Sequence, residues 1–214
     1  MNSRERILQD LRVTLPKENI SDSMVPADKD TFADFTDDMS TMKKRFKERF
    51  QELHGEFFAV SDEAAARTIL IRMVETFPEQ SCLIFVPEIE DRIVSTGAPV
   101  KQLITGRTEL SADSPDFARL EAGITGAEYL IARTGSIVLS AARSGGRRLS
   151  ILPPVHIVIA YAGQLVPSLD SVIGKPDESS YTTIITGPSR TSDIEKKLVL
   201  GAHGPKRLIV ILIG

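Results

Sequence analysis

Three side chains of this sequence are the best candidates for proton transfer: Glu128, His156 and His203. Glu128 is the only carboxylate between two Thr-Gly turns, so it is the local candidate for an acid, a base or an acyl-carrying nucleophile. His156 lies among aliphatic residues, where a hydrogen-bonded core histidine is the ordinary structure and a catalytic histidine facing a crevice is the alternative. His203 follows an expected helix, so it would either stabilise the negative end of the helix dipole or act as an acid or base.

Hydroxyl side chains stand beside glycines at three bends of the sequence, in "ITGAE", "RTGSI" and "ITGPSR". Glycine lets the backbone approach a ligand closely, and small polar turns can bind anions. Arg190 follows the third bend, where a carboxylate or phosphate is its natural partner and a salt bridge at the edge of the core is the alternative. The predicted ligand-binding residues are Thr125, Gly126, Thr134, Gly135, Ser136, Thr186, Gly187, Ser189 and Arg190.

Composition restricts the cofactors that this chain can hold. Cys82 is the only cysteine, which excludes an intramolecular disulfide and a cysteine-held iron–sulfur cluster built by this chain alone. With three histidines in the whole sequence, a structural transition-metal site is not expected either. We therefore predict that the chain itself holds no metal and no cofactor.

Charge and hydropathy restrict its partners and its location. The net charge is −3, but residues 117–214 carry 11 Lys and Arg against 7 Asp and Glu, which favours a small anionic ligand over nucleic acid. No apolar run approaches the roughly 20 residues of a membrane-spanning helix. The first residues, "MNSRERILQDLR", are charged and amphipathic rather than secretory. We therefore expect a cytoplasmic protein without a membrane span.

Alternating strand and helix patterns position these side chains. Apolar runs without polar alternation predict strands buried on both faces, as in a parallel sheet between helices. Two β runs around Thr134-Gly135 predict a hairpin. The predicted strands are 56–60, 81–87, 100–106, 155–161, 181–187 and 206–213, and the predicted helices are 61–77, 89–97, 165–174 and 192–201. The fold class is therefore α/β, a mostly parallel, helix-covered sheet with an inserted β-hairpin and additional N-terminal helices.

Two regions follow from these patterns. Residues 1–55 predict an N-terminal helical appendage and linker, because two amphipathic helical segments flank a stretch rich in Pro, Ser and Asp. Residues 56–214 predict the α/β domain. Within it, Ser192 and Glu195 have the spacing of a capping box, so helix capping alone explains them. The bend before them remains a candidate site, since ligands of α/β sheets bind where strands end and helices begin.

Three blocks of the sequence, "EAGITGAEYLIARTGSIVLS", "RLSILPPVHIVIA" and "TTIITGPSRTSDIEKKLVLGAHGPKRLIVILI", resemble the LUD-domain family, and within it the lactate-utilization protein C branch. The resemblance covers roughly residues 119–214 and includes the order and spacing of the blocks. It differs at Arg133, where the family usually has an acidic residue. The resemblance implies a fold similar to that of glucosamine-phosphate deaminases, ribose-phosphate isomerases and CoA transferases.

The same resemblance implies a role in a three-component system that oxidises L-lactate to pyruvate, with the iron–sulfur clusters on partner subunits. We therefore expect an accessory or substrate-handling subunit that binds a small carboxylate or phosphate. The alternative is a stand-alone enzyme, similar to a CoA transferase or a sugar-phosphate isomerase, that uses one of the candidate catalytic groups. Whether the chain catalyses a reaction is left open by the sequence.

Overall fold

A computed structural model describes residues 38–77, 82–85, 89, 92–93, 103–105, 120–140, 148–173, 182–192, 198–200 and 204–214. The chain divides into two compact units, residues 1–35 and 36–214, and all described residues belong to the second. This division differs from the boundary predicted at residue 55, because it places the helix before that residue with the sheets. His203 and most of the helix predicted at 89–97 lie outside the described residues.

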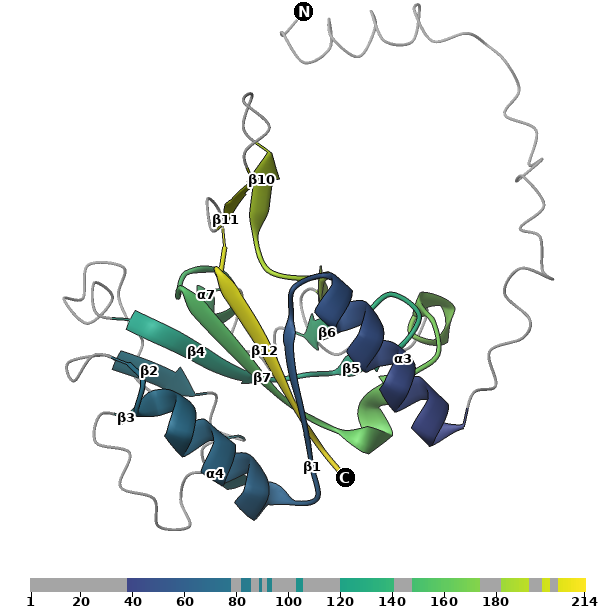
Figure 1. Cartoon of the computed structure of the whole chain (residues 1–214), viewed down its shortest axis with the longest axis horizontal. Helices are drawn as coiled ribbons and strands as arrows, with labels where there is room; N and C mark the ends of the chain where they lie inside the picture. Colours follow the sequence, from purple (N-terminus) through teal and green to yellow (C-terminus); the bar gives the residue numbers. More distant parts are fainter. Residues whose placement is uncertain are drawn as a thin grey trace, which may run out of the picture. The chain divides into compact units, whose positions relative to one another are not determined.

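Two sheets, three α-helices, two short 3-10 helices and one pair of short strands make up the described fold (Figure 1). The α-helices are α3 (Met39–Glu52), α4 (Glu63–Val74) and α7 (Arg148–Ile151), and the 3-10 helices include η3 (Ala162–Gln164) and η4 (Leu169–Ser171). The strands are β1 (Glu56–Val60), β2 (Cys82–Phe85), β3 (Leu103–Thr105), β4 (Leu120–Gly126), β5 (Tyr129–Ile131), β6 (Ser136–Ser140), β7 (Val155–Tyr161), β8 (Leu165–Val166), β9 (Thr182–Ile185), β10 (Arg190–Ser192), β11 (Leu198–Leu200) and β12 (Arg207–Ile213).

The larger sheet has six strands in the order β1-β12-β7-β4-β2-β3, and every neighbouring pair is parallel. Its interior strands β7 and β12 are buried along nearly their whole length. Continuous aliphatic runs without polar alternation are typical of strands covered on both faces. The predicted α/β class with a mostly parallel sheet is confirmed.

The smaller sheet has four strands in the order β8-β5-β6-β9. The predicted hairpin is confirmed: β5 and β6 are antiparallel, and the turn contains Gly135 with φ +65. Only a residue without a Cβ adopts this left-handed conformation at no cost. The predicted strand at 181–187 forms β9, but it pairs antiparallel with β6 and its residues alternate between exposed and half-buried. It therefore belongs to the smaller sheet and not to the buried parallel one.

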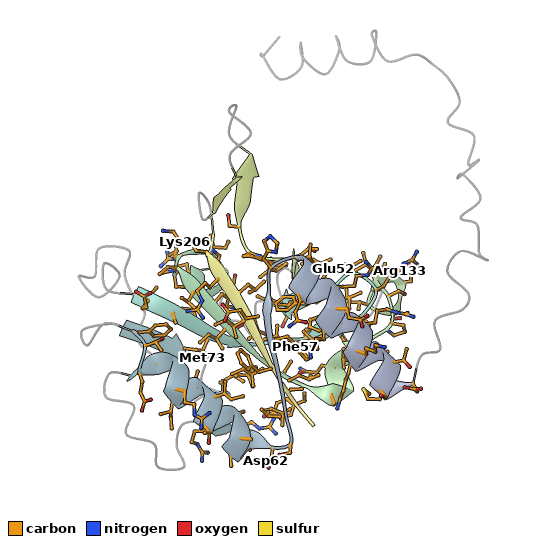
Figure 2. The ribbon with its side chains drawn as sticks, viewed as in Figure 1. Glu52, Phe57, Asp62, Met73, Arg133 and Lys206 are labelled. Carbon is orange, nitrogen blue, oxygen red and sulfur yellow. The ribbon has the colours of Figure 1, made fainter. Side chains whose placement is uncertain are left out.

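Opposite faces of the larger sheet pack into two separate apolar clusters. One face packs with Ala66 and Leu70 of α4. The other face packs with α3 and with the inner side of the smaller sheet, and Phe46 and Phe50 of α3 are fully buried there. Phe57 of β1 lies beside α3 in Figure 2, and its ring is 5.7 Å from that of Phe46. The α3 stripe is therefore a layer of the core.

Both long helices begin at an aspartate. The Asp38 carboxylate accepts a hydrogen bond from the Thr41 backbone N–H, and Asp62, at the start of α4 in Figure 2, accepts one from Ala65. These bonds satisfy N–H groups that have no partner within the helix. They also lower the pKa of both carboxyl groups. Asp62 thus caps α4, one residue later than the helix start predicted at residue 61.

The described residues differ from two of the predicted helices. Residues 165–174 form β8 and then the short η4, because Pro167 disfavours a helical conformation in the residue before it and cannot donate to a helix. Within 192–201, the described residues are Ser192, which ends β10, and 198–200, which form β11. These two strands pair antiparallel through Thr191 and Val199, and residues 193–197 and 201 lie outside the described part of the chain. β-branched residues at this pair favour extended structure over a short helix. Among the helices in the described part of the chain, none combines the length and apolar character that crossing a bilayer would require.

Candidate functional site

Thr125 and His156 form a fully buried polar pair on the larger sheet. His156 pairs in register with Gly123 of β4, and Thr125 lies two residues further along that strand, so both side chains project from the same face. The Thr125 Oγ1 and His156 Nε2 atoms are 2.9 Å apart, and neither residue is exposed to solvent. The structure therefore joins two of the predicted site residues, but inside the core.

The protonation state of His156 follows from its burial. Desolvation lowers the pKa of its imidazole from 6.5 to about 3, so the ring is neutral at physiological pH. Among the described residues, its Nδ1 atom has no hydrogen-bond partner. Either neutral tautomer thus leaves one buried nitrogen unsatisfied, at a cost of about 1–3 kcal/mol. In this structure the ring has no access to a ligand in solvent, so its position matches the core histidine considered from the sequence.

A chain of three hydroxyls joins the hairpin to the end of β9. Ser136 Oγ lies 2.7 Å from Thr134 Oγ1 and 2.8 Å from Thr186 Oγ1. Ser136 begins β6 and is buried, whereas both threonines are exposed. Because Ile137 pairs with Ile185, Ser136 and Thr186 are the next cross-strand neighbours, and strand pairing fixes their approach. The structure thus brings together three predicted ligand-binding residues from two segments 50 positions apart.

The hydrogen-bond capacity of this hydroxyl chain exceeds its internal bonds. Each hydroxyl has one O–H donor, and the two internal bonds use two of the three donors. If buried Ser136 donates to one threonine and accepts from the other, the remaining O–H belongs to an exposed threonine. That proton can be donated to a carboxylate or phosphate oxygen. The arrangement therefore suits an oxygen-bearing anion at the surface of the hairpin.

Gly135 places the hydroxyl chain against α3. A Cβ at this position would lie 2.6 Å from the Phe50 backbone nitrogen, so only glycine allows the turn to pack this closely. Arg133 belongs to the same turn, and α3 ends at Glu52, which Figure 2 labels. A helix C-terminus has the negative end of its dipole, so an anion bound here needs a cationic side chain nearby.

The loop after Thr186 packs at the amino end of β12. Gly187 has φ +90, and the Ser189 backbone N–H donates to the Pro205 carbonyl oxygen at 3.0 Å. A Cβ on Gly204 would lie 3.1 Å from the Ser189 Cβ. Arg190 is the first residue of β10, and only its backbone is described. The predicted residues 186–190 therefore form one continuous segment that starts at the hydroxyl chain.

Gly126 and Glu128 lie at the other end of the parallel strands. Gly126 is the last residue of β4, and Glu128 is half-buried just beyond it. The Ser140 hydroxyl donates to a Glu128 carboxylate oxygen at 3.2 Å. The carboxyl ends of parallel strands are where ligands of α/β sheets bind. Glu128 is thus the candidate catalytic group that the structure places at this edge, while His156 is buried.

The sequence predictions missed a second polar group at this edge. Tyr161 ends β7, and its hydroxyl donates to the carboxylate of Glu63 at the start of α4. The same carboxylate also accepts a hydrogen bond from Arg92. The pattern "IVIAYAG", a buried strand that ends at an amphipathic side chain, is the signal that could have indicated it. No group of three or more His, Cys, Asp or Glu side chains that could hold a metal ion occurs within the described ranges.

Comparison with known proteins adds the family context. Residues 43–213 match the model of the LUD domain. The chain is 36% identical over 131 residues to lactate utilization protein C of Deinococcus radiodurans, covering 57% of this chain and 62% of that protein. It is 33% identical over 127 residues to lactate utilization protein C of Bacillus subtilis, covering 56% of this chain and 52% of that protein. The matched region thus spans little more than half the length of these curated relatives.

A solved structure supports the fold. The crystal structure of a DUF162 family protein from Deinococcus radiodurans superposes with a TM-score of 0.63 and covers 83% of this chain and 99% of its own. The sequence identity is 23%, so this similarity concerns the fold alone.

Proposed function

The chain belongs to the LUD domain family, and from this premise we propose that it acts in lactate utilization as a subunit that binds a small carboxylate or phosphate. The names of the relatives from Deinococcus radiodurans and Bacillus subtilis support the lactate-utilization role. The observation that supports anion binding is the hydroxyl chain of Thr134, Ser136 and Thr186. In this proposal Arg190 supplies the positive charge, since it follows Thr186 by four residues.

The proposal includes a division of labour in the cytoplasm. This chain handles the substrate or product of L-lactate oxidation, and partner subunits hold the iron–sulfur clusters that accept electrons. The single cysteine of the sequence supports that division, because cysteine-held clusters need several thiolates from one site. A tagged chain from cells grown on lactate should therefore copurify with iron–sulfur proteins. Recovery of the tagged chain alone would contradict the assembly part of the proposal.

Anion binding is tested by calorimetric titration with L-lactate, pyruvate and inorganic phosphate separately. Ser136→Ala removes the middle of the hydroxyl chain and Thr186→Val removes one exposed end while keeping the side-chain shape. We expect each variant to weaken binding by about tenfold, the loss of one hydrogen bond to a charged group. Thr183→Val, on the same strand but outside the hydroxyl chain, is the matched control. Equal affinity in all four proteins would contradict the site.

The position of Glu128 favours one alternative, a stand-alone enzyme. Its carboxylate lies just beyond the carboxyl end of β4, where a reacting group could meet a ligand. In a transferase of this kind the carboxylate would act as nucleophile or base. Incubation with acyl-CoA and carboxylate acceptors, or with aldose phosphates, tests this activity against a Glu128→Gln variant. Turnover by the unaltered chain that the variant lacks would favour the enzyme over the binding subunit.

A further inference from the structure

Two hydrogen bonds and an ion-pair contact converge on a single carboxylate oxygen at the edge of the larger sheet. The Tyr161 hydroxyl donates to Glu63 Oε1 at 2.8 Å. The Arg92 Nε and Nη2 atoms both lie 3.1 Å from the same oxygen. A phenol and a guanidinium aimed at one point are a donor set for a carboxylate, and charge-assisted bonds of this kind are the strongest available to side chains.

This cluster lies where a ligand of a parallel sheet is expected. Tyr161 is the last residue of β7, one of the two central strands, and Glu63 is the first residue of α4, which follows β1. Both positions are at the carboxyl edge of the sheet. Asp62 already caps α4 there, so the donors come from side chains and not from free helix N–H groups. The cluster is separate in the fold from the hydroxyl chain, which the hairpin and β9 form.

The two donors are held in place by contacts that do not involve Glu63. The Arg92 guanidinium lies over the Tyr161 ring, 4.4 Å from its centroid, in a cation–π contact. Ile93, the next residue, is fully buried, and Arg67 of α4 donates to its carbonyl oxygen. These contacts anchor the backbone that carries Arg92. The donor set is therefore pre-organised, which reduces the cost of binding a carboxylate from solution.

Glu63 itself is the movable member. Its side chain is 38% exposed, and it reaches the donors from the first turn of a helix by a flexible stem. Burial, together with the Glu63 carboxylate, raises the pKa of Tyr161 to about 12. The phenol therefore remains protonated, and able to donate, throughout the physiological range. If Glu63 rotates into solvent, it leaves a guanidinium and a phenol hydroxyl facing the vacated position.

We propose that Arg92 and Tyr161 form a carboxylate-binding subsite, which the Glu63 side chain occupies in this structure and from which a small monocarboxylate displaces it. Glu63 thus acts as an internal competitor that sets the affinity of the subsite. The apparent affinity for a monocarboxylate is the intrinsic affinity of the subsite multiplied by the fraction of chains in which Glu63 has left it. The inference does not rest on the hydroxyl chain and concerns a second, separate site.

The test is chemical rescue by acetate in the full chain. Glu63→Ala removes the internal carboxylate, so acetate should raise its melting temperature in a saturable manner and more than sodium chloride at equal ionic strength. Apparent affinity for acetate should be about tenfold or more higher than in the unaltered chain. Adding Arg92→Gln or Tyr161→Phe to Glu63→Ala should abolish the acetate-specific increase.

Glu56→Ala is the matched control. It breaks the pair of Glu56 with Arg207, whose side-chain exposures of 38% and 46% resemble the 38% and 56% of Glu63 and Arg92. That pair has no phenol partner in its described contacts. An acetate effect confined to Glu63→Ala supports the subsite. An equal effect in Glu56→Ala would overturn it, because any unpaired arginine would then suffice.

A second measurement covers the case in which Glu63→Ala does not fold. The chain has three tyrosines and no tryptophan, so a protein labelled with carbon-13 at the tyrosine ring gives a simple spectrum. Acetate should shift the Tyr161 signal of the otherwise unaltered chain, and Arg92→Gln should remove that shift. A Tyr161 signal that does not respond would overturn the proposal. Ser136→Ala should leave these responses unchanged, so failure of the hydroxyl site and of this subsite can be told apart.

Discussion

The buried imidazole of His156 should make the chain less stable in mild acid. Its pKa is 6.5 in an unfolded chain and about 3 in the folded protein, because burial disfavours the charged ring. Between these values the unfolded state binds a proton that the folded state does not. Stability therefore falls as the pH decreases below 6.5, by up to about 1.4 kcal/mol per pH unit.

The size of the effect can be worked out for a practical pair of conditions. Between pH 7.5 and pH 5, this one side chain should reduce the free energy of unfolding by about 2 kcal/mol. The result hardly depends on the folded pKa as long as that value stays below about 4. Most carboxyl groups titrate below pH 5, so this interval isolates the histidines.

Urea unfolding followed by circular dichroism at the two pH values provides the assay. His156→Gln keeps a polar side chain near Thr125 but has no group that titrates at this position. Its free energy of unfolding should therefore fall by about 2 kcal/mol less between pH 7.5 and pH 5 than that of the unaltered chain. The unaltered chain, measured at the same two pH values, is the reference for this difference. Identical pH dependence in the His156→Gln variant and the unaltered chain would refute the reasoning.

Three further substitutions test the packing. Gly123→Ala should destabilise the chain by more than about 2 kcal/mol in urea unfolding, since its Cβ would lie 2.2 Å from the Leu149 carbonyl oxygen. Gly163→Ala, whose Cβ would meet nothing within 4 Å, should be nearly neutral in the same assay. Phe50→Ala should lower the free energy of unfolding by about 3–5 kcal/mol in chemical denaturation, because it removes a fully buried ring that is stacked on Phe46. A decrease below about 1 kcal/mol would show that α3 is not part of the core.

Long patterns could be predicted from the sequence because a single local signal determines them. The aliphatic runs at 155–161 and 206–213 specify buried parallel strands, and the apolar stripe at 61–77 specifies a helix. The hairpin at Thr134-Gly135 could be predicted because its turn needs a residue that accepts positive φ. Of the candidate hydroxyls, the hairpin carries Thr134 and Ser136.

Short segments could not be predicted because tertiary pairing determines them. A capping-box signature at Ser192 and Glu195 indicated a helix, yet Ser192 and residues 198–200 are in the paired strands β10 and β11, since a short segment has too little local helix stability to resist strand pairing. Glu195 lies outside the described residues. At 165–174 Pro167 argues against a helix, but the apolar residues around it have helical spacing and led to the helix prediction. The contact between Ser136 and Thr186 depends on the pairing of β6 with β9, which no local pattern specifies.

The same limit applies to the site at the carboxyl edge. Glu63, Arg92 and Tyr161 come from three separate segments of the chain and share no sequence motif. The candidate site predicted from the sequence instead divides into separate groups, with Thr125 and His156 inside the core. Chemistry-bearing residues could thus be named from the sequence, but their grouping required the sheet topology.

Threonine methyl spectra of the carbon-13-labelled full chain, titrated with L-lactate and, separately, with inorganic phosphate, test anion binding at the hydroxyl chain most directly. The methyl groups of Thr134 and Thr186 lie next to the two exposed hydroxyls, whereas Thr183 lies outside the hydroxyl chain. We predict saturable shifts of the first two signals with at least one of these anions and no shift of the third. Spectra in which neither Thr134 nor Thr186 responds to either anion would contradict the proposed binding site.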